Sequence, residues 1–277
     1  MRKILIADSG ATKTDWAYVE NGKPIFVKSA GLHPAYLSDD EMSGIIRKSV
    51  GKFSPNHIYF FGAGCHSNAV NERIKSVLKK EFDTVWIEIS DDLTGGAKSH
   101  LQKSDGIIAA FGTGSICGRY QHGKITQRSA ALGYAIGDEG SAADIGKRVL
   151  RNYFRRRFDD ETQAYISDKL QEASYSEWME RIYQSRHPNR ELAKIAGLVL
   201  NDSFPAQVES LLVDSIQSFI DSQLHQLDSK PEEPIVCTGT VAASNREIVN
   251  NVFASAGFKK VEIGGSVIEG LVDFYSE

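Results

Sequence analysis

Residues 4–16 read ILIADSGATKTDW, an apolar run that ends in Asp8 and opens into a turn of small and hydroxyl-bearing residues. A short apolar run bounded by turn residues predicts a buried strand over residues 3–7. Glycine lets backbone N–H groups approach an anion, and successive amides in a turn bind anions. The stretch therefore predicts either an ordinary hairpin or a phosphate-binding turn over Gly10–Thr14, with Asp8 placed to hold Mg²⁺.

The same pattern returns in the middle of the chain. Residues 105–125, DGIIAAFGTGSICGRYQHGKI, again give an apolar strand, a small polar turn, a short strand and a Gly-Lys turn. Taken alone, each turn is more often a structural hairpin than a ligand loop. Two of them in one chain favour phosphate binding at Gly10–Thr14 and Gly112–Ser115, and they indicate a duplicated fold.

The other segments alternate between helix and strand. Strands are expected over 58–64 and 85–90, helices over 39–52 (with Ser38 or Asp39 as N-cap) and 68–82, and a hairpin over 15–20 and 25–29. This alternation predicts an α/β layer whose largely parallel sheet begins with an antiparallel hairpin. Residues 141–228 are expected to be mostly helical, and strand–glycine turn–helix units are expected over 231–244 and 261–275.

Composition excludes several classes of protein. A net charge of −4 and a pI near 6.0 argue against a nucleic-acid partner, and the basic run at 151–157 fits a solvated helix face. The 3 cysteines are far apart and fit free thiols rather than disulfides or a zinc site. With no signal-peptide core and no apolar stretch of roughly 18 residues, we expect a cytoplasmic protein without membrane spans.

Two familiar phosphate motifs are absent. Gly95–Ser99 has the wrong spacing for the GxxxxGK[ST] loop. Gly112–Gly118 is GxGxxxG rather than GxGxxG, and it leads into a strand rather than a helix, which argues against a dinucleotide site. A different phosphate-binding architecture is therefore needed.

At these motifs the sequence resembles the actin/Hsp70/hexokinase superfamily. Asp8–Thr14 resembles its first phosphate motif, Phe111–Ser115 its second, and Cys237–Val241 a degenerate form of its adenosine motif. Residues 132–141, LGYAIGDEGS, resemble the GDEGS segment of N-acetylglucosamine kinases and the related BadF/BadG/BcrA/BcrD ATPases. The resemblance runs in order over essentially the whole chain.

The resemblance implies an α/β fold of two RNase-H-like (actin-like ATPase) domains with a cleft between them and a helical insertion in the second. The boundary is expected near 92–105, which gives an N-terminal domain over 1–102 and a C-terminal domain over 103–277. The cofactors implied are ATP and Mg²⁺, and the partner is a small-molecule amino sugar. A homodimer is considered, and the oligomeric state is left open.

The resemblance also implies roles for individual residues. Asp92 is expected to be the catalytic base and Asp8 to position the metal. A slip of one residue, to Asp91, stays open, and both residues also fit as N-caps of the following helix. The implied nucleotide-binding residues are Gly10, Thr12, Lys13, Thr14, Gly112, Thr113, Gly114, Ser115, Gly239 and Val241. The implied substrate-binding residues are His33, Gly64, Asp91, Asp138 and Glu139.

Two of these positions have competing interpretations. His33 stands where such kinases tend to carry an asparagine that contacts sugar hydroxyls, so the exact sugar is open, and His33 also fits as a surface loop residue. Asp138 and Glu139 are expected at the sugar, although acidic residues just before a helix also complement its N-terminus.

The sequence thus predicts an ATP-dependent sugar kinase that phosphorylates N-acetylglucosamine or a related amino sugar. One alternative is a BadF/BadG-type ATPase that drives a partner protein. Such activators carry cysteines for an iron–sulfur cluster, which the 3 scattered cysteines here argue against. The other alternative is a non-catalytic nucleotide or sugar sensor, because one fold hosts many functions.

Overall fold

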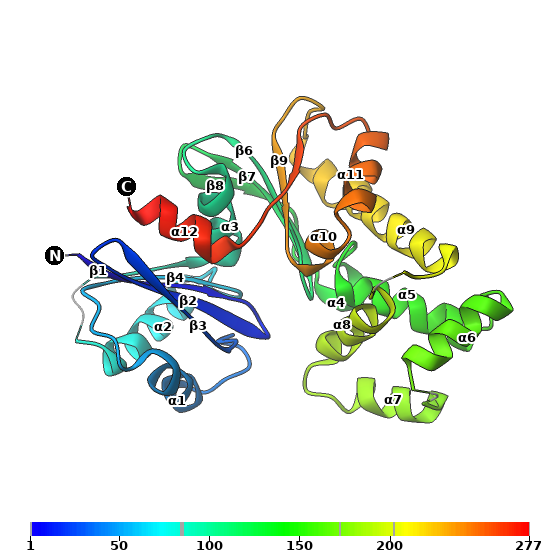
Figure 1. Ribbon diagram of the computed structural model, residues 1–277, viewed down its shortest axis with the longest axis horizontal. Helices are drawn as coiled ribbons and strands as arrows, with labels where there is room; N and C mark the ends of the chain where they lie inside the picture. Colours follow the sequence, from blue (N-terminus) through cyan, green and yellow to red (C-terminus); the bar gives the residue numbers. More distant parts are fainter. Residues whose placement is uncertain (1, 84–85, 172, 202, 277) are drawn as a thin grey trace. The chain divides into compact units, whose positions relative to one another are not determined.

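The computed structural model describes residues 2–83, 86–171, 173–201 and 203–276. The chain divides into two compact units. The first contains residues 1–105, 120–125 and 264–277, and the second contains residues 106–119 and 126–263. A five-stranded sheet forms the centre of each unit (Figure 1).

The first sheet has the strand order β3-β2-β1-β4-β5. β1 pairs antiparallel with β2 and parallel with β4, and β4 pairs parallel with β5, which confirms the predicted hairpin and the parallel strands that follow it. The register sets Ser9 opposite Gly62, and Gly62 opposite Asp91, so three parallel strands end level with one another. The strands are β1 (Lys3–Ser9), β2 (Lys13–Glu20), β3 (Lys23–Ala30), β4 (His57–Gly62) and β5 (Trp86–Asp91). The expected first residue of β5, Val85, lies outside the described residues.

Helices cover both faces of this sheet. Leu5 and Ala7 point toward α1 (Asp39–Val50) and α2 (Asn68–Glu81), whereas Ile4 and Ile6 pack in a second cluster with residues of α12 (Val267–Ser276). The remaining helix of this unit, α3 (Asp92–Leu101), packs against α12 (Figure 1). Because side chains alternate across a strand, burial of both faces explains why residues 4–7 are continuously apolar.

The second sheet repeats this plan. Its strand order is β10-β9-β6-β7-β8. Read from the other edge, β8-β7-β6-β9-β10, it matches the first sheet strand for strand, with β6 in the place of β1. β6 is parallel to β9, as β1 is to β4. The duplication predicted from the two turns is therefore confirmed. The strands are β6 (Gly106–Phe111), β7 (Ser115–Gln121), β8 (Lys124–Arg128), β9 (Ile235–Thr238) and β10 (Val261–Ile263).

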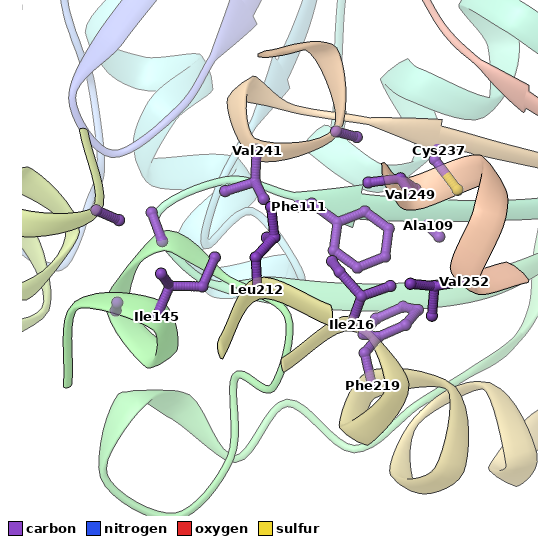
Figure 2. Close-up of a cluster of buried hydrophobic side chains, with 14 of the residues drawn as sticks. Ala109, Phe111, Ile145, Leu212, Ile216, Phe219, Cys237, Val241, Val249 and Val252 are labelled. Atoms are coloured by element: carbon purple, nitrogen blue, oxygen red, sulfur yellow. The ribbon is translucent and has the colours of Figure 1, made fainter. Parts of the chain in front are cut away.

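The predicted helical segment follows β8. Phe111, at the end of β6, packs against Phe219 of α9, with ring centroids 4.4 Å apart and the rings inclined by 54°. Figure 2 shows these side chains with Ile216 and Val249 in one buried cluster, so the second turn begins directly on the core of its unit. The helices of the second unit are α4 (Gly133–Ile136), α5 (Ala142–Phe154), α6 (Asp160–Lys169), α7 (Tyr175–Tyr183), α8 (Pro188–Val199), α9 (Ala206–Ser222), the 3₁₀ turn η1 (Leu224–Leu227) and, after β9, α10 (Thr240–Ser244) and α11 (Arg246–Ser255).

Within the described ranges, no helix combines the length and hydrophobicity that crossing a bilayer requires.

Candidate functional site

The first turn, Gly10–Thr14, joins β1 to β2. It is closed by a hydrogen bond from Gly10 N to Lys13 O of 2.9 Å, and Gly31 N donates to Thr12 O at 3.0 Å. A Cβ atom on Gly31 would lie 2.4 Å from Gly10 O, so only glycine at position 31 lets the turn pack this closely. Thr12 and Lys13 are exposed, and Lys13 Nζ pairs with Asp15 at 2.7 Å.

Thr14 supports this turn from beneath. Its side chain is fully buried, and its hydroxyl lies 2.8 Å from Ser9 Oγ and donates to the carbonyl oxygen of Ala30 at 3.2 Å. Ser9 Oγ in turn accepts from Leu32 N at 3.1 Å. The Thr14 hydroxyl therefore fixes the end of the hairpin from below. The residues of the turn that face solvent are Thr12 and Lys13.

Asp8 lies beside the first turn, on the sheet face that carries Ile4 and Ile6. Burial, followed by the negative charges of Asp92 and Asp15, raises the pKa of Asp8 to about 7, and only Lys13 opposes this shift. The two carboxyl groups that the sequence singled out, Asp8 and Asp92, are thus brought within electrostatic reach of each other. A cation bound there would relieve their repulsion.

The structure distinguishes Asp91 from Asp92. Asp91 is the N-cap of α3: one carboxylate oxygen accepts from Thr94 N at 2.9 Å and the other from Thr94 Oγ1 at 3.0 Å. Asp92 is the first residue of the helix and is partly exposed, and its Oδ1 accepts from Leu93 N at 3.1 Å. Asp91 therefore fixes the start of the helix, and Asp92 is the better placed of the two to act on a ligand.

His33 and Gly64 lie against each other. Gly64 has a φ of +84°, and a Cβ atom there would lie 2.9 Å from Cε1 of His33. The His33 ring stacks on Tyr36 at 4.3 Å, and its Nδ1 accepts from Ala35 N at 3.2 Å. Nδ1 thus serves as an acceptor, an arrangement that in a neutral imidazole places the ring proton on Nε2.

Cys65 follows in the same loop and is buried. Burial raises the pKa of the Cys65 thiol to about 12, and the charges of Asp92 and Asp91 add to this shift. The thiol is therefore protonated at neutral pH, which argues against nucleophilic catalysis here. Its coupling to both aspartates also shows that the loop after β4 and the start of α3 are neighbours, as the level strand ends require.

The second turn, Gly112–Ser115, is attached to the start of α5. Gly112 N donates to Gly114 O at 3.0 Å, while the carbonyl oxygens of Gly112 and Thr113 accept from Ala142 N and Ala143 N at 2.9 and 3.2 Å. Ser141 caps the same helix through its hydroxyl, which accepts from Asp144 N at 3.1 Å. The turn and the helix thus satisfy each other's backbone groups.

Asp138 and Glu139 pack directly on this second turn. A Cβ atom on Gly114 would lie 3.0 Å from the Asp138 carboxylate, and Ser115 Oγ donates to Glu139 O at 2.6 Å. Burial, with a smaller contribution from the charge of Glu139, raises the pKa of Asp138, whereas the Ser115 N–H lowers it through a long contact of 3.5 Å. Residues expected to serve the sugar and residues expected to serve the nucleotide are therefore in contact within one unit.

The segment resembling an adenosine motif lies at the end of β9. Gly239 has a φ of +93°, and a Cβ atom there would lie 2.4 Å from the carbonyl oxygen of Phe111, so this position requires glycine. The Val241 side chain is buried in the core below (Figure 2). The second turn and this segment are thus adjacent at the ends of β6 and β9.

Sequence reasoning missed the buried polar residues that hold these turns. Ser215 of α9 accepts from Gly140 N at 3.0 Å and donates to Asp144 Oδ2 at 2.8 Å. Gln223, the C-cap of α9, reaches Ser115 and Glu139. The one available signal was the occurrence of polar residues among the apolar positions of a helix, which does not reveal their partners.

No group of three His, Cys, Asp or Glu side chains in the described part of the chain is arranged to hold a metal ion. Mg²⁺ is commonly held by one or two carboxylates together with waters and substrate phosphates. Asp8, whose pKa is raised by burial and by neighbouring negative charge, fits that mode of binding.

Comparisons with known proteins find sugar kinases among the proteins similar to this chain. No family model matches the chain. An N-acetylmuramic acid/N-acetylglucosamine kinase from Clostridium acetobutylicum is 37% identical over 112 residues, which cover 39% of this chain and 35% of the relative. The alignment thus spans about a third of the length of that curated relative.

Solved structures match over nearly the full length. A candidate N-acetylglucosamine kinase from Porphyromonas gingivalis has a TM-score of 0.88 and 27% identity, with 98% of each chain covered. A ROK family glucokinase from Streptomyces griseus, in complex with glucose and AMPPNP, has a TM-score of 0.62 and 12% identity, with 99% of this chain and 98% of that chain covered. The second likeness shows the fold alone.

Proposed function

We propose that this chain, which belongs to the actin/Hsp70/hexokinase superfamily and is similar to N-acetylglucosamine kinases, transfers the γ-phosphoryl group of ATP to N-acetylglucosamine or a related amino sugar. The observation that carries the proposal is the position of Asp92, which begins α3 next to Asp8 where three parallel strands end. Ligands of open α/β sheets bind at the carboxyl ends of such strands.

Asp92 is the general base in this proposal. A carboxylate within hydrogen-bond reach of a sugar hydroxyl accepts its proton as the oxygen attacks phosphorus. Asp91 and Thr94 fix the first turn of α3, and so they fix the direction of the Asp92 side chain. His33, which stacks on Tyr36 and accepts from the backbone N–H of Ala35, would donate from Nε2 to an oxygen of the sugar.

The nucleotide side uses the two turns. Bound Mg·ATP supplies the phosphoryl group and neutralises its charge, and the protein contributes mainly positioning and electrostatic stabilisation. Asp8 would hold the metal through water, and the backbones of Gly10–Thr14 and Gly112–Ser115 would hold phosphate oxygens. Thr14 and Ser115 act by fixing these turns, since their hydroxyls bond to protein groups. Gly239 and the backbone of Val241 would border the adenosine, since the Val241 side chain is buried in the core.

This proposal accounts for the cysteines better than a partner-driving ATPase does. An iron–sulfur cluster at a dimer interface needs thiolates at a surface, whereas Cys65, Cys117 and Cys237 are all buried. Burial raises the pKa of each thiol. Because the proposed reaction consumes ATP and a small sugar, we place it in the cytoplasm.

The proposal is tested by identifying the product. Protein is incubated with Mg·ATP and N-acetylglucosamine, and phosphorus NMR and mass spectrometry then examine the sugar. We expect a sugar monophosphate that forms with wild-type protein and is depleted with Asp92→Asn. Inorganic phosphate in place of a phosphorylated sugar would indicate an ATPase and overturn the proposal.

A further inference from the structure

Gln223 makes a set of hydrogen bonds beneath the second turn that no proposed role yet uses. Its side chain is 3% exposed. Nε2 donates to Ser115 Oγ at 2.8 Å and to Glu139 Oε2 at 3.2 Å, and Oε1 accepts from Ser129 Oγ at 3.1 Å. Ser129 Oγ also accepts from Cys117 N at 3.1 Å, so one amide connects the second turn, the Asp138–Glu139 turn and the strand β7.

The chemistry fixes which way this amide points. A carboxylate accepts only, so the group facing Glu139 must be the NH₂ end of Gln223. The same NH₂ group meets the Ser115 hydroxyl, whose own proton goes to the carbonyl oxygen of Glu139. Both amide protons and the amide oxygen are thus used, which is the condition under which a buried polar network rigidifies its surroundings.

A second residue of the same helix strengthens this connection. Ser215 bonds Gly140 N, just after Glu139, and it lies on the buried side of α9. Gln223 and Ser215 therefore connect Ser115 and the Asp138–Gly140 turn to the same helix, α9, and its C-cap. Gly114, the residue that the Asp138 carboxylate faces, lies next to Ser115 in the second turn.

We infer that Gln223 is a positioning residue for nucleotide binding, which holds the second turn in its phosphate-binding shape by tying Ser115 to Glu139 and Ser129. The inference rests on the proposed function, because it assigns Gln223 to the same nucleotide site. In this role Gln223 touches no ligand and acts only through the second turn.

The test exchanges the two members of the hydrogen-bonded pair. Gln223→Glu places a carboxylate against the Glu139 carboxylate, and Gln223→Met keeps the side-chain length but removes every hydrogen bond. The double variant Gln223→Glu/Glu139→Gln restores a carboxylate–amide pair with its ends exchanged. Gln226→Glu is the matched control: it makes the same change of charge at a neighbouring glutamine, which bonds Ala130 N and Ser222 O instead.

Two measurements are made on each folded variant. Amide hydrogen exchange over 112–118 is measured in the nucleotide-free protein, and ATP affinity is measured together with the KM values for ATP and for sugar. For Gln223→Met and Gln223→Glu we expect exchange in this segment to speed by about tenfold or more, as loss of buried hydrogen bonds should do. ATP binding should weaken by a similar factor, the KM for ATP should rise more than the KM for sugar, and Gln226→Glu should resemble wild type.

The double variant provides the decisive comparison, because it should recover part of the protection and of the ATP affinity that Gln223→Glu loses. Unchanged exchange and unchanged ATP affinity in both single variants would overturn the inference, and so would a double variant no better than Gln223→Glu. If wild type releases no ADP with any sugar, the kinase proposal fails. Hydrogen exchange in the nucleotide-free variants still decides the role of Gln223.

Discussion

Burial and then the charge of Asp92 raise the pKa of Asp8, although Asp8 lies near the end of β1 and Asp92 begins a helix that follows the fifth strand. The register of β1, β4 and β5 brings the two carboxyl groups together, because it sets Ser9 level with Gly62 and Gly62 level with Asp91. In the proposed reaction Asp8 would hold the metal and Asp92 would accept the hydroxyl proton, and phosphoryl transfer depends on such positioning of charged groups.

This relationship predicts how stability depends on pH. A carboxyl group whose pKa rises from about 4 in the unfolded chain to about 7 in the folded protein binds its proton more tightly when folded. Below about pH 4 Asp8 is protonated in both states and does not destabilise the fold through its charge. As pH rises from about 4 to about 7, ionisation of Asp8 lowers the free energy of unfolding, and above about pH 7 this destabilisation is complete.

The measurement compares wild type with Asp8→Asn by urea unfolding at pH 5 and pH 8 without ligand. Asn carries no charge, so Asp8→Asn should lose less stability between the two pH values than wild type does. The difference should be of the order of 1 kcal/mol or more. Equal pH dependence in the two proteins would show that Asp8 ionises as readily as an exposed aspartate.

Asp92→Asn should lower kcat by about 10²-fold or more, the magnitude expected for loss of a general base, while the KM for ATP changes little. Asp91→Asn is the matched control, since asparagine also caps helices and keeps an acceptor for Thr94 N. It should retain activity within a few-fold. Steady-state kinetics of both variants decide the assignment: the reverse pattern would identify Asp91 as the base.

Gly114→Val should weaken ATP binding, because its Cβ atom would lie 3.0 Å from the Asp138 carboxylate and its methyl groups would crowd the second turn. Gly197→Ala in α8 is the control: a Cβ atom there meets nothing within 4 Å, and alanine favours a helix. Calorimetric titration with ATP measures both. If Gly114→Val binds ATP as wild type does, the second turn is a structural hairpin only.

His33→Asn should change which sugars are preferred and leave the KM for ATP unaltered. Asparagine is shorter than histidine and lacks the ring that stacks on Tyr36 and contacts Gly64, so the donor would move relative to the sugar. The ratio of kcat/KM for N-acetylglucosamine and N-acetylmuramic acid measures the effect. A ratio equal to that of wild type would place His33 outside the sugar site.

Much of the fold could be predicted because it depends on local patterns. Spacing and residue type within a short window predict three features: the strand at 3–7, the repeated turn at 112–115 and the helix start at Ser38. The structure confirms all three.

What the sequence did not predict depends on contacts between distant segments. Ser115 and Gln223 are separated by 108 positions, and nothing in either local sequence indicates that they are hydrogen-bonded. The burial of the Thr14 hydroxyl beneath its turn depends on Ala30, in the neighbouring strand. Asp138 contacts Gly114 because the Asp138–Glu139 turn packs on the second turn, which the residue types alone cannot show.

The most direct test of the central claim is ADP release from Mg·ATP, measured across N-acetylglucosamine, N-acetylmuramic acid, glucosamine, glucose and no sugar. We predict turnover that depends on the sugar, is greatest with an N-acetylated amino sugar and is lower by about 10²-fold or more in Asp92→Asn. ADP release that is the same with and without sugar, or no release with any of them, would contradict it.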